Sequence, residues 1–152
     1  MSTYDAAKAE VRFPAPSASV QGDVKANRGF IDLAVTGALA INDIVNLAKL
    51  PAKHLPVDCI IDTDAVDTGS AVVLNFEIYD PVGDDSYAIN TGSIVGRAGG
   101  IDRMDELAAL RMPIIDNDCY LRAVVATGPT TGATTGKLAA TLMYRGAEVL
   151  DR

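Results

Sequence analysis

The sequence predicts an all-β protein: an antiparallel β-sandwich of jelly-roll type, with one short helix in a connection and an extended N-terminal arm. Three observations predict this class. Two segments alternate strictly between apolar and polar residues, several others are rich in β-branched residues and end at Gly, Asp or Thr, and no strand–helix–strand rhythm is present. About seven or eight strands of this kind favour two stacked antiparallel sheets over a parallel sheet covered by helices.

The first 16 residues, MSTYDAAKAEVRFPAP, mix Ala with charged residues and end in a Pro-x-Pro pair that favours extended backbone. We therefore divide the chain into an extended N-terminal arm at 1–16 and a β-sandwich domain at 17–152. Such an arm would hold a neighbouring protein through its larger apolar side chains and its prolines, with Phe13 best suited to fill a pocket. These candidate interface residues are Tyr4, Val11, Phe13, Pro14 and Pro16.

The strands are predicted from period-two patterns and from β-branched composition. In SAVVLNFEIYD (70–80), apolar residues fall on one face and Asn75 and Glu77 on the other, and KLAATLMYRG (137–146) repeats this alternation. The segments 29–37, 57–64 and 119–128 alternate less strictly but are rich in β-branched residues, and each is closed by a turn residue. These segments form the predicted sandwich.

One helix of about ten residues is predicted after the Gly99-Gly100 pair and before Pro113. Its apolar residues recur at spacings of three, and acidic residues occupy its early turns, where negative charge suits a helix N-terminus. The apolar positions are Ile101, Met104, Leu107 and Leu110.

The composition of the chain disfavours several classes of function. The chain has 152 residues, 49% of them hydrophobic, and a formal net charge of −7, so its field repels a nucleic-acid backbone. No apolar run reaches the roughly 20 residues needed to span a bilayer, and the N-terminus lacks the features of a signal peptide. We expect a protein that is made in the cytoplasm and binds neither nucleic acid nor membrane.

No catalytic constellation is found. His54, the one histidine, lies between two prolines with lysines beside it, and we interpret it as a residue at an exposed bend. Cys59 and Cys119 match no zinc or redox spacing and are read as reduced residues in or near the core. We expect neither an enzyme nor a bound cofactor.

Two further patterns are explained without a ligand. The run TGPTTGATTGKL (127–138) has the wrong spacing for a phosphate-binding loop and leads into a strand, so we predict a hairpin loop. GRAGG (96–100) likewise lacks the dinucleotide-binding order. The acids in DTDAVDTG, YDPVGDD and IIDNDC do not follow calcium-loop spacing, and we interpret them as solvated turn acids with no metal.

The stretch from Gly29 to Tyr144 resembles the head decoration (capsid cement) proteins of tailed phages. The resemblance lies in a strand ending LAKLP, then AKH, then LPVDCIIDTDAVDTGSAVVLNFEIYD, followed by GSIVGRAGG and a short helix. It is a pattern of strands and bends without a catalytic signature. It implies a β-sandwich subunit on the outer surface of the virion, bound to the major capsid protein and to itself as a homodimer or homotrimer.

Two alternatives remain open at this stage. A tail or head–tail connector protein is also β-rich and oligomeric, and would differ in its copy number per particle. A jelly-roll carbohydrate-binding module would share the fold. The absence of Trp and the presence of only five Tyr disfavour a platform for stacking sugars.

Overall fold

The computed structural model describes residues 1–5 and 23–147. Their elements, in chain order, are β1 (Thr3–Asp5), β2 (Val24–Asp32), α1 (Leu33–Thr36), β3 (Ile44–Leu50), β4 (His54–Thr63), β5 (Val73–Asp80), β6 (Asp85–Ser93), the 3₁₀ turn η1 (Val95–Arg97), β7 (Gly100–Arg103), α2 (Leu107–Leu110), β8 (Cys119–Thr127) and β9 (Lys137–Gly146).

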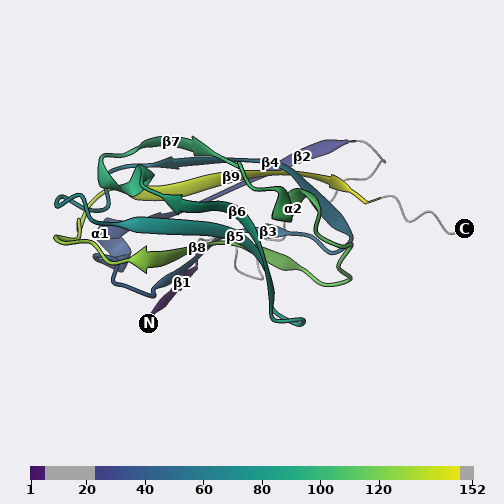
Figure 1. Ribbon diagram of the computed structural model, residues 1–152, viewed down its shortest axis with the longest axis horizontal. Coiled ribbons are helices and arrows are strands. Elements are labelled where there is room, and N and C mark those ends of the chain that lie inside the picture. The colour runs from purple at the N-terminus through teal and green to yellow at the C-terminus, as the bar shows by residue number, and fades with distance from the viewer. Residues whose placement is uncertain (6–22, 148–152) are drawn as a thin grey trace, which may run out of the picture.

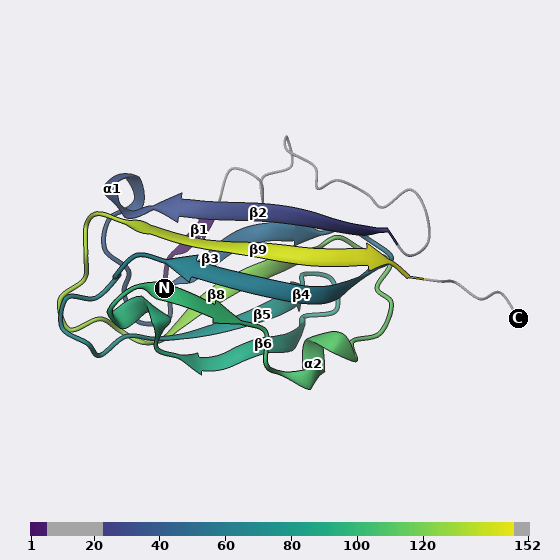
Figure 2. The same ribbon diagram turned by 90° about the horizontal axis from the view of Figure 1, so that it is seen from above.

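The strands form two stacked sheets, as Figures 1 and 2 show. One sheet has the order β2-β9-β4-β7, and the other has the order β1-β3-β8-β5-β6. Strands β2 to β9 pair antiparallel within their sheets and cross repeatedly from one sheet to the other along the chain, which is the jelly-roll arrangement. The predicted fold class is confirmed, and β1 adds a parallel edge strand beside β3.

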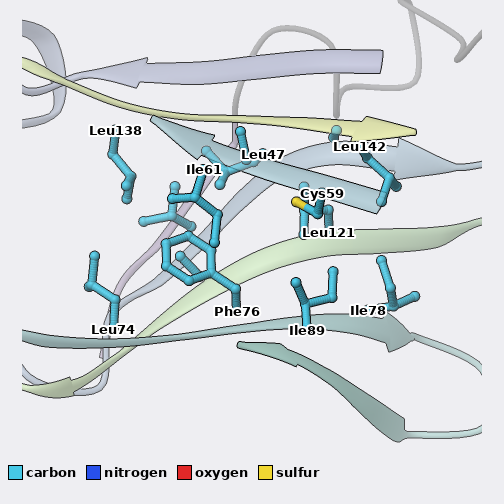
Figure 3. Packing of buried hydrophobic residues seen from close by; sticks show 14 of the residues in the cluster. Leu47, Cys59, Ile61, Leu74, Phe76, Ile78, Ile89, Leu121, Leu138 and Leu142 are labelled. Carbon is cyan, nitrogen blue, oxygen red and sulfur yellow. The ribbon is translucent and has the colours of Figure 1, made fainter. Parts of the chain in front are cut away.

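The core lies between the sheets because inward-facing positions of both layers are apolar. Figure 3 shows Phe76 and Ile78 of β5 pointing toward Ile61 of β4 and Leu142 of β9. All four are fully buried. Burial of aliphatic and aromatic side chains of this size stabilises a fold by about 1.5–3 kcal/mol each. The strict alternation at 70–80 and 137–146 therefore reports the inner faces of β5 and β9 correctly.

The helix predicted around residues 101–110 is wrong over most of its length. Residues 100–103 form β7, which pairs with the end of β4, and only Leu107–Leu110 are helical. Ile101, Leu107 and Leu110 are exposed, while Ala109 is buried instead. The apolar residues at spacings of three belong here to a short strand followed by a single helical turn. The pairing of β7 with β4 overrides the helical pattern.

Two other boundaries differ from the sequence prediction. The strand assigned to 29–37 ends at Asp32, whose side chain accepts a hydrogen bond of 2.9 Å from the Ala34 backbone and so caps α1. The segment 85–93, which has no regular alternation, is nonetheless the strand β6. Its pairing with β5 contains two register shifts, and bulges of this kind break the period-two pattern.

The loop after η1 requires a glycine. Gly99 has a φ of +76°, and a Cβ at this position would lie 3.0 Å from both the Ala65 nitrogen and the Thr63 carbonyl oxygen. The chain therefore passes against the end of β4 at Gly99 and turns into β7. This turn places Ile101 at the edge of the four-stranded sheet.

Candidate functional site: the outer face of the four-stranded sheet

The start of the predicted arm belongs to the sandwich. Thr3, Tyr4 and Asp5 pair with Ile44, Val45 and Asn46 of β3, and the Asn46 side chain donates a 2.7 Å hydrogen bond to Asp5. Tyr4 is half-buried and packs against the chain's own core. The other candidate interface residues, Val11, Phe13, Pro14 and Pro16, lie outside the described residues.

His54 is buried, so the expectation of an exposed bend is wrong. Lys53 adopts a φ of +60°, and this reversal turns His54 inward at the start of β4. Its Nδ1–H donates a 2.8 Å hydrogen bond to the Ala52 carbonyl, and its ring packs edge-on against Tyr144 with centroids 5.5 Å apart. Through these contacts the His54 side chain contributes to the packing of the sandwich.

Asp67 corrects the expectation of solvated turn acids. It is fully buried and accepts hydrogen bonds from the backbone of its own loop, at 2.7 Å from Gly69 and 2.6 Å from Ala71. It also accepts from Thr130 and Thr131 in the predicted hairpin loop before β9. Its carboxylate therefore joins two loops. Asp80 is also buried, and its carboxylate accepts from the Val82 backbone.

The two cysteines are free and buried, as expected for reduced core residues. Burial, followed by the charge of Asp58, raises the pKa of Cys59 to about 12. Burial also raises the pKa of Cys119 to about 12, with the charges of Asp80 and Asp118 adding to the effect. Both groups are therefore held as thiols at neutral pH.

Among residues 1–5 and 23–147, no three His, Cys, Asp or Glu side chains are arranged to hold a metal ion. In the same part of the chain, no helix has the length and apolar character needed to cross a membrane.

Exposed apolar side chains instead lie on the solvent side of the four-stranded sheet. We call three neighbouring rows of the strand register there the outer face. Its residues are Phe30, Ala139, Asp62 and Ile101 in the first row, Arg28, Thr141, Ile60 and Arg103 in the second, and Ala26, Met143 and Asp58 in the third.

A hollow on this face lies beside Ile101, and most of its lining is polar or charged. Phe30 at one edge of the sheet is 47% exposed and Ile101 at the other is 74% exposed, whereas Ala139 between them is 1% exposed. The hollow has a volume of about 350 Å³, and its lining residues are Arg28, Asp62, Thr63, Asp64, Gly100, Ile101, Lys137 and Ala139. Lys137 borders it and places its Nζ 5.0 Å from the centre of the Phe30 ring.

The charges of the outer face are paired with each other. The Arg28 guanidinium binds both carboxylate oxygens of Asp62, and Arg103 binds Asp58. The hydrogen bond to Asp62 raises the pKa of Arg28. These two ion pairs form within the chain, and Asp64 and Lys137 also line the hollow beside them.

The opposite face of the molecule is built differently. There Arg122 donates a 2.5 Å hydrogen bond to Glu77 and stacks over the Tyr79 ring at 3.6 Å from its centre. Lys49 lies over Tyr120. No exposed large apolar residue lies on the described strands of that face, so the two faces differ in what they offer to another protein.

Sequence reasoning missed the outer face. Ile101 was assigned to the apolar positions of a helix, and Phe30 carried no local signal of exposure. The four residues of the first row come from four separate strands, so only the strand register brings them together.

Comparison with known proteins places this jelly roll among phage capsid proteins. It superposes on a chain from the "Capsid of Ralstonia phage GP4" with a TM-score of 0.84 and 30% sequence identity, covering 97% of this chain and 99% of that one. A chain from the "Cyanophage Pam1 capsid asymmetric unit" has the same fold, with a TM-score of 0.65 and 21% identity over 91% of this chain and 95% of that one. No family model and no curated protein sequence matches.

The class is therefore that of small jelly-roll proteins found in phage capsids. The chain belongs to the phage capsid protein family that includes the matched chain of Ralstonia phage GP4. This confirms the coarser part of the resemblance seen in the sequence, a phage head protein.

Proposed function

We propose that the protein is a decoration, or cement, protein that binds the outer surface of a phage head and bridges neighbouring major capsid protein subunits. The observation that carries the proposal is the whole-length match: nearly all of this 152-residue chain corresponds to nearly all of a chain present in a phage capsid. The proposal includes no catalysis and no cofactor.

The structure supports this role through its rigidity. Two packed sheets with a continuous apolar core form a stiff body that can hold two contact surfaces at a fixed separation. A ligand that binds only the assembled shell stabilises that shell by mass action. Many copies on one lattice also raise the effective concentration of each contact, so that individually modest contacts suffice.

The predicted arm supplies a second contact in this proposal, and Phe13 is its candidate anchor. Because β1 belongs to the sandwich, deletion of residues 1–16 would disturb the fold as well as the arm. A point substitution is therefore the better test. Phe13→Ala should weaken binding to heads in a sedimentation assay, whereas Val35→Ala, at an exposed apolar residue of α1, should not. Equal binding by both variants would remove the arm from the proposal.

Copy number tests the proposed function itself. A cement protein covers the shell, so quantitative gel analysis of purified virions should find it in hundreds of copies, in proportion to the major capsid protein. A tail or connector component would be present in about a dozen copies or fewer, set by the symmetry of a single ring. A count in that lower range would overturn the proposal.

A further inference from the structure

We propose that the hollow on the outer face binds one unit of a saccharide that carries no net charge. Residues of β2, β4, β7 and β9 line the hollow, so all four strands of the sheet contribute to it. Its volume of about 350 Å³ is near the lower end of the roughly 300–1,000 Å³ of small-molecule sites. A site of this size suits a single sugar unit. The inference goes beyond the proposed function and does not depend on it.

The charges of the lining favour a neutral ligand. The two cations are Arg28 and Lys137, and the two anions are Asp62 and Asp64, so the lining carries no formal net charge. The chain as a whole has a formal net charge of −7, and its field repels anions such as phosphate. A hard cation needs several carboxylate oxygens, but both oxygens of Asp62 already accept hydrogen bonds from Arg28. The hollow therefore selects for polarity without charge.

Hydrogen-bonding groups of both kinds remain for a ligand. The Arg28 guanidinium has five N–H donors, and within the described chain it uses three of them, two on Asp62 and one on Thr141. Lys137 adds an ammonium group that lies against the Phe30 ring and forms no ion pair with a described residue. Asp64 accepts a 2.9 Å hydrogen bond from the Lys137 backbone through one carboxylate oxygen, which leaves its other oxygen for a ligand.

Sugar hydroxyl groups match this mixture of donors and acceptors. A hydroxyl both donates and accepts hydrogen bonds, so neighbouring hydroxyls bind a carboxylate and a cation side by side. Hydrogen bonds of this kind are stronger than those between neutral groups. Ile101, which is 74% exposed, supplies an apolar wall for the C–H groups of the ring. Recognition through hydroxyl groups requires no stacking platform and is compatible with the absence of Trp.

The backbone around the hollow is fixed before a ligand arrives. The N–H of Asp64 donates a 2.8 Å hydrogen bond to the Lys137 carbonyl, and the Thr63 hydroxyl donates to the same carbonyl at 3.1 Å. The end of β4 is thereby held against the start of β9, and the two free charged groups keep a constant separation of their backbones. A site organised in this way loses little conformational freedom on binding.

An NMR titration of isotope-labelled protein tests the inference. The probes are the methyl glycosides of glucose, galactose, mannose and N-acetylglucosamine, each added to about 50 mM, because a ligand held by a few hydrogen bonds binds with a dissociation constant of about 1–10 mM. At least one probe should shift the amide resonances of Gly100, Ile101 and Ala139 to saturation. Sodium acetate and sodium phosphate at the same concentration should not.

Two lysine variants locate the binding. Lys137→Met removes the ammonium donors and keeps the length of the side chain, so it should raise the dissociation constant roughly tenfold. Lys25→Met is the matched control, because Lys25 lies on β2 outside the hollow, and it should leave the constant unchanged. The dispersion of the amide resonances checks that each variant keeps the fold.

Three results would overturn the inference. The first is saturation by none of the four glycosides, and the second is a stronger response to acetate or phosphate, which would make Lys137 an anion contact. The third is equal affinity of Lys137→Met and Lys25→Met, which would place the sugar outside the hollow. None of these results bears on the copy number in virions, so the inference and the proposed function fail separately.

Discussion

Asp67 holds two loops together at one end of the sandwich. Burial opposes ionisation of its carboxylate and would raise the pKa, but hydrogen bonds from the backbone N–H groups of Gly69, Thr131, Val72 and Ala71 outweigh burial and lower the pKa below its ordinary value of 3.8. The charged form is therefore part of the folded structure.

Asp67→Asn tests this arrangement. The amide group places an N–H₂ where the carboxylate accepts hydrogen bonds, so backbone donors of both loops lose an acceptor while they remain buried. We expect the melting temperature at pH 7 to fall by roughly 5 °C or more. Asp64→Asn, at an exposed acid of the same region, is the control and should have a smaller effect.

The effect should depend on pH. A carboxylate whose pKa is lowered by folding contributes stability that is fully present above its ordinary pKa and is lost as the pH falls through the folded-state pKa. The difference in free energy of unfolding between wild type and Asp67→Asn should therefore be constant near neutral pH and shrink below about pH 4. A difference that stays constant down to pH 2 would contradict a charged Asp67.

The two thiols report on opening of the core. With the pKa of both Cys59 and Cys119 raised to about 12, almost no thiolate is available at pH 8. Ellman's reagent should therefore leave the native protein unreacted over minutes and detect two thiols in denaturant. Rapid reaction of the native protein with either thiol would show that the core is more open than described.

At the scale of elements, β1 shows that the chain's first residues serve the fold. Tyr4 contributes an aromatic side chain to the core beside Val45. Tyr4→Ala should lower the free energy of unfolding by about 1–2 kcal/mol, less than the roughly 3–5 kcal/mol typical of a fully buried aromatic residue. Thr3→Ala, on the exposed side of the same strand, should change it by less than about 0.5 kcal/mol. Denaturant titrations would measure both, and equal effects would place Tyr4 outside the core.

Whether a strand can be predicted from the sequence depends on how that strand buries its side chains. β5 and β9 place alternate residues on an inner face, so their period of two is visible in the sequence. β6 is bulged, and β7 is a short edge strand with its largest residue exposed, so neither produces that period. The prediction of a helix at 101–110 failed for this reason.

The outer face was beyond sequence reasoning for a different reason. Its composition is set by which strands are neighbours, and β9 lies between β2 and β4 although it is the last strand in the chain. Phe30 and Ala139 are adjacent only through that order. A pattern within a single segment carries no information about the order of the strands in a sheet.

At the scale of the whole molecule, the sandwich presents two unlike faces on a stiff core. One face combines exposed Phe30 and Ile101 with paired charges, and the other is a layer of stacked Tyr, Arg and Lys side chains.

A density map of intact particles tests the central claim most directly. The account predicts density for this jelly roll on the outside of the shell, in contact with at least two neighbouring major capsid protein subunits. Density for the same fold confined to the tail or its connector, or none on the outer surface, would contradict it.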